Sequence, residues 1–267
     1  MPLPPETKAA IKRLIVDNMR NKLRGTELEG FAKPFHEKLF SQERIRTASF
    51  FHSCSGAIGK SLFETIARLV AEDHFPVVRP QYRVEGILSA RAQAVIEDII
   101  DDLGRRSGDP RKRHPNMVEE AREVLEVSGG EGTATEQIAD LFLQQADGEE
   151  IYLQMKTSKP NKGESEEAKR QMLKIISLRN RPVKTLVCMN YNPYEPESYR
   201  WTIPLNYLKV GEDLLIGRDF WDFIGGQGTY QELLELFDEA GRELAQLIER
   251  RFRDLGVGQA SLKGFQQ

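Results

Sequence analysis

The sequence has no long apolar run and few cysteines. No apolar stretch among its 267 residues approaches the roughly 18 residues that a membrane span needs. The N-terminal segment MPLPPETKAAIKRL lacks the apolar core of a signal peptide. Cys54 and Cys188 are the only cysteines, and they lie far apart without metal-type spacing. These absences predict a cytoplasmic protein with free thiols, not a secreted or membrane-spanning one.

Several catalytic signatures are also missing. The four histidines are scattered, and none pairs at zinc-ligand spacing with a cysteine or another histidine. No nucleophile elbow of a serine hydrolase occurs. The segment GAIGKS (56–61) ends like a phosphate-binding loop, but Cys54 stands where that motif needs glycine. The sequence therefore argues against a zinc enzyme, a serine hydrolase and a P-loop nucleotide-binding protein.

Positive charge is not in excess, since the formal net charge is −3, but basic residues gather locally. One group lies in a segment interrupted by Pro and Gly and comprises Arg105, Arg106, Arg111, Lys112 and Arg113. A second group comprises Lys156, Lys159 and Lys162. Both are candidate DNA-phosphate contacts. The alternative for a charge run in a loop is an ordinary solvated surface.

The most informative stretch is IADLFLQQADGEEIYLQMKTSKPNKGE, residues 138–164. Asp147-Gly148 is a strong hairpin signal, because Gly tolerates positive φ and Asp bonds its own backbone. After this turn apolar and polar residues alternate, which predicts a strand with Gln154 and Lys156 on a polar face. The hairpin would set Asp140, on the preceding strand, beside that face.

These residue types suit metal-dependent phosphodiester cleavage. Mg²⁺ takes hard oxygen ligands and keeps several waters, so Asp140 is the candidate anionic ligand and Gln154 offers an amide oxygen. Lys156 would orient or activate water, or stabilise charge in the transition state. Ser158, one pleat beyond on the same face, is a candidate phosphate contact. The alternative is an amphipathic hairpin with an exposed polar face.

Glu64 is a further candidate, in the apolar helical segment FETIARLVA. As a functional residue it would be a second acidic group near the metal, supplied by a helix that packs on the sheet. As a structural residue it would complete a capping box with Ser61, three positions earlier. A capped helix needs no metal to explain its glutamate, so both interpretations stay open.

The order of elements favours an α/β fold in which helices flank a mixed central β-sheet. We expect one nuclease domain over residues 1–267, with a helical N-terminal part (about 1–130), a catalytic core (about 131–205) and a helical C-terminal part (about 206–267). Helical patterns cover 6–23, 33–47, 61–73, 89–105, 116–127, 164–179 and 229–254, and strand patterns after the hairpin cover 183–192 and 198–203.

Taken together, Asp140, Gln154-Met155-Lys156 and Glu64 resemble the PD-(D/E)XK nuclease superfamily. The resemblance assigns Asp140 to the motif's Asp, Gln154 to its variable acidic or amide position, and Lys156 to its Lys. Ala139 replaces the Pro that often precedes the Asp. Gln154 leaves the site one carboxylate short, which makes Glu64 more necessary.

The chain also resembles type II restriction endonucleases of the TdeIII family. Four segments carry this resemblance: KPFHEKLF (33–40), SFFHSCSGAIGKSLFETIA (49–67), ADLFLQQADGEEIYLQMKTS (139–158) and GRDFWDFIGGQGTYQELL (217–234). The resemblance implies Mg²⁺-dependent cleavage of double-stranded DNA at a short GC-rich palindrome of the GGNCC type. It also implies a homodimer and a cognate DNA methyltransferase as functional partner.

Two other functions remain open at this point. One is a repair or RNA-processing nuclease on the same core, which the site residues cannot separate from a restriction enzyme. The other is a non-catalytic DNA-binding module, which the missing carboxylate at Gln154 favours. The bases that such a protein would read are not given by the sequence.

Overall fold

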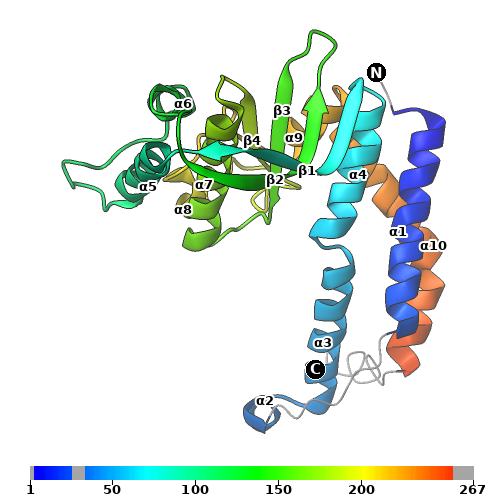
Figure 1. Ribbon diagram of the computed structural model, residues 1–267. Coiled ribbons are helices and arrows are strands. Elements are labelled where there is room, and N and C mark those ends of the chain that lie inside the picture. Colours follow the sequence, from blue (N-terminus) through cyan, green and yellow to red (C-terminus); the bar gives the residue numbers. More distant parts are fainter. Residues whose placement is uncertain (1–2, 26–33, 255–267) are drawn as a thin grey trace. The chain divides into compact units, whose positions relative to one another are not determined.

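The computed structural model describes residues 3–25 and 34–254 (Figure 1). These residues form two compact units, one of residues 3 and 64–230 and the other of residues 4–25, 34–63 and 231–254. The first unit holds the sheet. Its elements are the greater part of α4 (Lys60–Glu72), then β1 (Val77–Leu88), α5 (Ala90–Gly104), α6 (Met117–Glu126), β2 (Thr133–Gln144), β3 (Glu150–Lys156), α7 (Lys162–Arg179), β4 (Lys184–Met189), α8 (Thr202–Leu205), β5 (Leu214–Ile216) and α9 (Arg218–Gly225).

The sheet has five strands in the order β1-β2-β3-β4-β5. β1, β2 and β3 are antiparallel neighbours, whereas β3, β4 and β5 are parallel. Helix α7 makes the connection from β3 to β4, as parallel strands require a long crossover (Figure 1). The fold is therefore a mixed sheet flanked by helices, as the sequence predicts, and it is consistent with a restriction-endonuclease-like core.

Helices α5, α6 and α7 cover one face of this sheet. Their apolar residues pack with strand residues Val187, Met189, Leu214 and Ile216 in one cluster. Ile175 and Leu178 of α7 extend the cover over a second cluster that includes Val84, Phe142 and Tyr152. Both β3 and β4 are buried on both faces, but only β4 reads as an apolar run, whereas β3 alternates and buries the polar Gln154.

The second unit is helical and comprises α1 (Pro5–Gly25), α2 (Pro34–Leu39), α3 (Gln42–Ala57) and most of α10 (Thr229–Asp254). Salt bridges join α1 to α10: Lys8 to Glu232 at 2.9 Å, Lys12 to Glu239 at 3.0 Å, and Arg20 to Glu243 at 2.7 Å. No helix among the described residues is both long and apolar enough to cross a membrane.

Most sequence predictions of helices are confirmed within a few residues, and the helix at 229–254 is confirmed at both ends. Three predictions are wrong. The helix expected at 33–47 is two helices, α2 and α3, separated by Phe40 and the N-cap Ser41. The strand expected at 198–203 is absent, because this segment is a loop that leads into α8. The N-terminal part is not only helical, because β1 lies within it.

Strand β1 was not expected because of its sequence, VVRPQYRVEGIL. Pro80 cannot donate to a ladder and usually argues against a strand, but β1 is the edge of the sheet, where proline is tolerated. Gln81 has a positive φ of 49°, which interrupts the pleat between the pairs Pro80–Leu141 and Tyr82–Ala139. Both features hide the alternation on which a strand prediction depends.

Candidate active site

The hairpin that carries the candidate residues forms as its sequence predicts. Gly148 has a φ of 88°, in the region that favours glycine, and the Asp147 carboxylate accepts a hydrogen bond from the Glu149 N–H at 3.0 Å. The backbone closes the turn through Gln145, whose N–H donates to the Glu149 carbonyl at 2.9 Å. The turn therefore fixes the register in which β2 and β3 meet.

The interpretation of this hairpin as an amphipathic one with an exposed polar face is wrong. Gln154 is 3% exposed and Tyr152 is fully buried. Tyr152 donates to the Glu150 carboxylate at 2.7 Å, and α7 lies over the face that sequence alternation made polar. Buried polar side chains need hydrogen-bond partners, so the partners of the polar residues on this face show how the site is held together.

The β2–β3 ladder ends at the pair Leu141–Leu153, and Asp140 and Gln154 stand at the next position. Here two side chains replace the backbone ladder. The Asp140 carboxylate accepts a hydrogen bond from the Met155 N–H at 2.6 Å. The Gln154 side-chain amide donates to the Ile138 carbonyl at 2.7 Å. We call this place the fork, because β2 continues along β1 while β3 continues along β4.

Lys156 lies two residues beyond Gln154 and is half-buried. Its ammonium group donates to the side-chain oxygen of Gln171 on α7 at 3.3 Å. Sequence reasoning did not find Gln171, because only the packing of α7 brings it to the strand. Asp140, Gln154 and Lys156 are thus gathered at the end of the hairpin away from its turn.

Ser158 follows the end of β3 and is 6% exposed, and its hydroxyl has no hydrogen-bond partner. Tyr199 donates to the Ser158 carbonyl at 2.8 Å. The exposed Lys159 ammonium lies 4.9 Å from the ring centre of Tyr194 and 5.7 Å from that of Trp201. Trp201, in the segment expected to be a strand, and Tyr194, before it, therefore lie beside the second basic group.

Glu64 lies early in α4 and is half-buried, in the same compact unit as the hairpin. The predicted capping box is wrong in its position, because α4 begins at Lys60 and Ser61 lies inside it. The first helical hydrogen bonds go instead to the Gly59 carbonyl. Ser61 is therefore not the N-cap of α4, and the role of Glu64 in the site stays a prediction.

The basic segment between α5 and α6 uses much of its charge internally. Arg113 donates to Glu123 through two bonds of 2.9 and 2.6 Å, which raises the pKa of the Arg113 guanidinium. Arg105 donates to Asp102 at 2.7 Å. Lys112 donates to the carbonyl of Leu103, and burial lowers the pKa of its ammonium.

Other members of this segment face solvent. Arg106 is exposed, and Arg111 is exposed with a long 4.0 Å ion pair to Asp109. Lys162, in the second basic group, is also exposed and lies 3.5 Å from Glu166. These three cations are better placed for a phosphate than Arg105 or Arg113. All the DNA contacts remain predictions.

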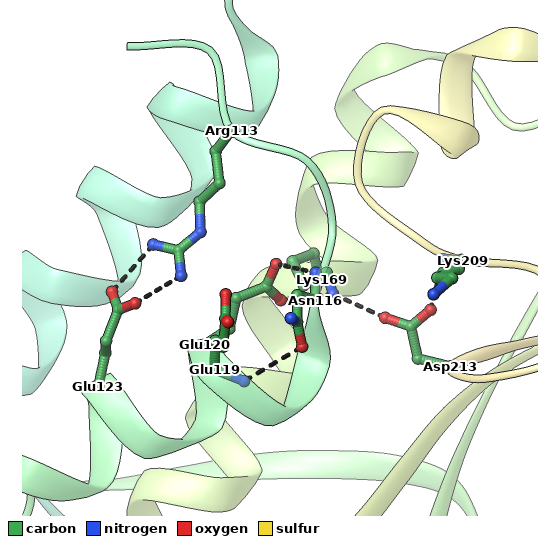
Figure 2. A network of polar contacts seen from close by, with 8 residues as sticks. All are labelled: Arg113, Asn116, Glu119, Glu120, Glu123, Lys169, Lys209 and Asp213. Carbon is green, nitrogen blue, oxygen red and sulfur yellow. Dashed lines mark hydrogen bonds and ion pairs between the residues drawn. The ribbon is translucent and has the colours of Figure 1, made fainter.

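Lys169 of α7 is the most unusual charge in this unit and was not singled out from the sequence. Figure 2 shows its ammonium between the carboxylates of Glu120 on α6 and Asp213 before β5, each at 2.7 Å. All three side chains are at most 3% exposed. The backbone N–H groups of Asn116 and Lys209 donate to the same two carboxylates at 2.9 and 2.5 Å. This buried network fixes α7, which covers the fork.

The fork has donor atoms of the kind that a hard divalent cation takes. Met155 occupies one Asp140 oxygen, and the side-chain oxygen of Gln154 has no hydrogen-bond partner in the described chain. A carboxylate and an amide oxygen on neighbouring strands fit Mg²⁺, which retains several waters. Within residues 3–25 and 34–254, no three His, Cys, Asp or Glu side chains gather to hold a metal. The fit is therefore to a cation with few protein ligands.

The Asp140 carboxylate at the fork affects the pKa of Cys188 on β4. Cys188 is fully buried and pairs in register with Met155. Burial raises the pKa of its thiol well above the usual value, and the Asp140 carboxylate raises it further. Both cysteines are free thiols, as the sequence predicts.

Asp140, Gln154 and Lys156 lie together on one hairpin of the mixed sheet, and comparison with known proteins gives the class of the chain. The chain is similar to the type II restriction enzyme HgiBI of Herpetosiphon aurantiacus, with 33% identity over 218 residues, 80% of this chain and 78% of the relative. HgiCII of the same organism is 31% identical over 230 residues, 84% and 82% of the two chains. The chain is thus a type II site-specific deoxyribonuclease.

The particular family follows from a model that matches residues 5–241, described as "Type II restriction endonuclease, HinfI". The chain belongs to this family. The type II restriction enzyme MjaII of Methanocaldococcus jannaschii is a more distant relative, with 24% identity over 218 residues, 74% of this chain and 56% of the relative. Enzymes of this class cut double-stranded DNA and generally use a divalent metal.

Proposed function

We propose that this restriction endonuclease is Mg²⁺-dependent and cuts DNA with a PD-(D/E)XK site at the fork. The observation that carries the proposal is the bond from the Met155 N–H to the Asp140 carboxylate, between Gln154 and Lys156 in the sequence of β3. It gives the Asp140 carboxylate a fixed place where the ladder between β2 and β3 ends. Bound Mg²⁺ would supply charge neutralisation at the phosphate and a more acidic water.

The residues of the chain have separate roles in this proposal. Asp140 would hold the cation, and the Gln154 amide oxygen and Glu64 would assist it. Lys156 holds the attacking water and donates to charge that develops on the phosphate. Ser158, Lys159, Lys162 and the exposed arginines of the α5–α6 segment contact DNA phosphates, which positions the duplex without reading its bases.

The finer assignments are proposals of the same kind. Membership of the TdeIII family and a GC-rich palindromic target of the GGNCC type follow from the sequence resemblance. A palindrome is most simply cut by a two-fold dimer, in which each subunit cleaves one strand. A cognate methyltransferase would protect the host DNA, and we place the enzyme in the cytoplasm, where that DNA lies.

Cleavage of unmethylated phage DNA tests the proposal. With Mg²⁺ we expect discrete fragments, and with a chelator none. Asp140→Ala and Lys156→Ala should each lower the single-turnover cleavage rate by about a hundredfold or more, while DNA is still bound. Asp147→Ala, on the turn of the same hairpin, and Lys209→Ala, an exposed lysine of the same unit, are the matched controls and should cut normally.

The outcome also separates the alternatives. A smear of products indicates a nuclease without site preference, such as a repair or RNA-processing enzyme. Salt-sensitive DNA binding without any Mg²⁺-dependent cut indicates a non-catalytic module. Cleavage at the wild-type rate by Asp140→Ala or Lys156→Ala would show that the site lies elsewhere.

A further inference from the structure

Two reciprocal bonds hold the fork where the ladder between β2 and β3 stops. From β2, the Asp140 side chain reaches the Met155 N–H of β3. From β3, the Gln154 side chain reaches the Ile138 carbonyl of β2. Asp140 is 8% exposed and Gln154 is 3% exposed, so water competes little for either bond. Loss of one partner would leave a buried polar group unpaired.

The orientation of the Gln154 amide follows from the chemistry of its partner. A backbone carbonyl only accepts hydrogen bonds, so the end of the side chain that lies 2.7 Å from the Ile138 oxygen must be the NH₂ group. The amide oxygen then points away from that carbonyl. An ionised glutamate with the same geometry would place one acceptor against another and could not make this bond.

We propose that Gln154 is a positioning residue that holds the fork closed and thereby fixes the Asp140 carboxylate on the Met155 N–H. The inference rests on the proposed function only in taking Asp140 as the cation-binding carboxylate. Gln154 stands where the superfamily pattern allows a carboxylate, and the proposal gives its side chain a structural role in addition to metal binding. In this chain the amide supplies a donor that a carboxylate lacks, so Gln154→Glu removes a cross-strand bond although it adds a charge.

The chain provides a matched control for this bond. Gln137 donates its side-chain amide to the same Ile138 carbonyl at 3.2 Å, but from the neighbouring position on the same strand. Gln137→Met therefore removes an amide donor from that oxygen without removing a link between strands. Gln154→Met has nearly the same shape as the native side chain and removes the link.

Amide hydrogen exchange of Met155 tests the position of the fork directly. Selective ¹⁵N-methionine labelling leaves six labelled residues, and the experiment uses the whole protein without metal or DNA. We expect the Met155 amide to exchange about tenfold faster in Gln154→Met and Gln154→Glu, and at nearly the wild-type rate in Gln137→Met. An unchanged Met155 amide in both Gln154 variants overturns the proposal.

Cleavage as a function of Mg²⁺ concentration separates positioning from simple ligation. If Gln154 positions Asp140, the single-turnover rate at saturating Mg²⁺ falls in both Gln154 variants and is not restored by more metal. Restoration of Gln154→Met by excess Mg²⁺, together with a fully active Gln154→Glu, would show ligation alone and overturn the proposal. If the wild-type protein does not cut with Mg²⁺, the proposed function fails, while the exchange rates still decide whether Gln154 holds the fork.

Discussion

Removal of the Lys169 ammonium should destabilise the sheet-bearing unit strongly. In Lys169→Met, the carboxylates of Glu120 and Asp213 lose their shared cation, although each keeps one backbone donor. At 2.7 Å each pair has a gross attraction of about 6 kcal/mol in an effective dielectric of 20, and most of it offsets the cost of burying the charges. Breaking such a pair costs about 3–5 kcal/mol, because it leaves buried charge uncompensated.

Urea unfolding followed by tryptophan fluorescence measures this loss. Both tryptophans of the chain, Trp201 and Trp221, lie in the same unit as Lys169, so the signal reports on that unit. The free energy of unfolding should fall by about 3–5 kcal/mol in Lys169→Met. In Lys209→Met, which loses only an exposed pair with Glu212, it should fall by less than about 1 kcal/mol.

A triple variant tests whether uncompensated buried charge causes the loss of stability in Lys169→Met. Glu120→Gln, Lys169→Met and Asp213→Asn together remove every charge of the network, so the triple variant should be more stable than Lys169→Met alone. The opposite order, or a loss below about 1 kcal/mol in Lys169→Met, would mean that these carboxylates reach water or another cation. The contacts of Lys169 with Glu120 and Asp213, drawn in Figure 2, would then not fix α7.

Two further predictions concern packing. Cys188 should resist iodoacetamide at pH 8 until the protein unfolds, because burial and the Asp140 charge raise the pKa of its thiol. The half-buried Cys54 should react earlier. Peptide mass spectrometry measures the labelling, and early labelling of Cys188 would contradict its burial. Gly132→Ala should lower the free energy of unfolding by about 1–3 kcal/mol, since its Cβ would lie 2.3 Å from the Leu88 carbonyl oxygen; unchanged urea unfolding would refute this contact.

The sequence predicts those elements of the fold whose structure is determined by residues within the element itself. The helix at 229–254 and the Asp147-Gly148 turn are local, since side-chain spacing and turn chemistry suffice, and both are confirmed. Strand β1 depends on being at an edge, which Pro80 alone cannot reveal. The segment 198–203 has strand-like composition, but Tyr199 and Trp201 donate to the carbonyls of Ser158 and Pro160, which fixes it as a loop.

In the candidate site, too, some features follow from the local sequence and others from tertiary packing. Hairpin register is enough to place Asp140 opposite Gln154, so their proximity could be predicted from the sequence. The burial of Gln154 could not, because it depends on α7, which packs over a face that alternation assigns to solvent. The need for an amide at position 154 could not be predicted either, because the Ile138 carbonyl becomes a partner only where the two strands separate.

The two halves of the site therefore depend on different parts of the fold. The Asp140 carboxylate is held by a bond within the hairpin, whereas the Lys156 ammonium takes one of its partners, Gln171, from α7. Lys169 is two residues before Gln171 on that helix, and its buried network fixes the helix to α6 and to the start of β5. A change at Lys169 should thus disturb the surroundings of Lys156 more than the bond between Asp140 and Met155. The bond between Asp140 and Met155 and the surroundings of Lys156 can then be perturbed separately, because α7 links Lys156 to the buried network of Lys169 but does not link the Asp140–Met155 bond to it.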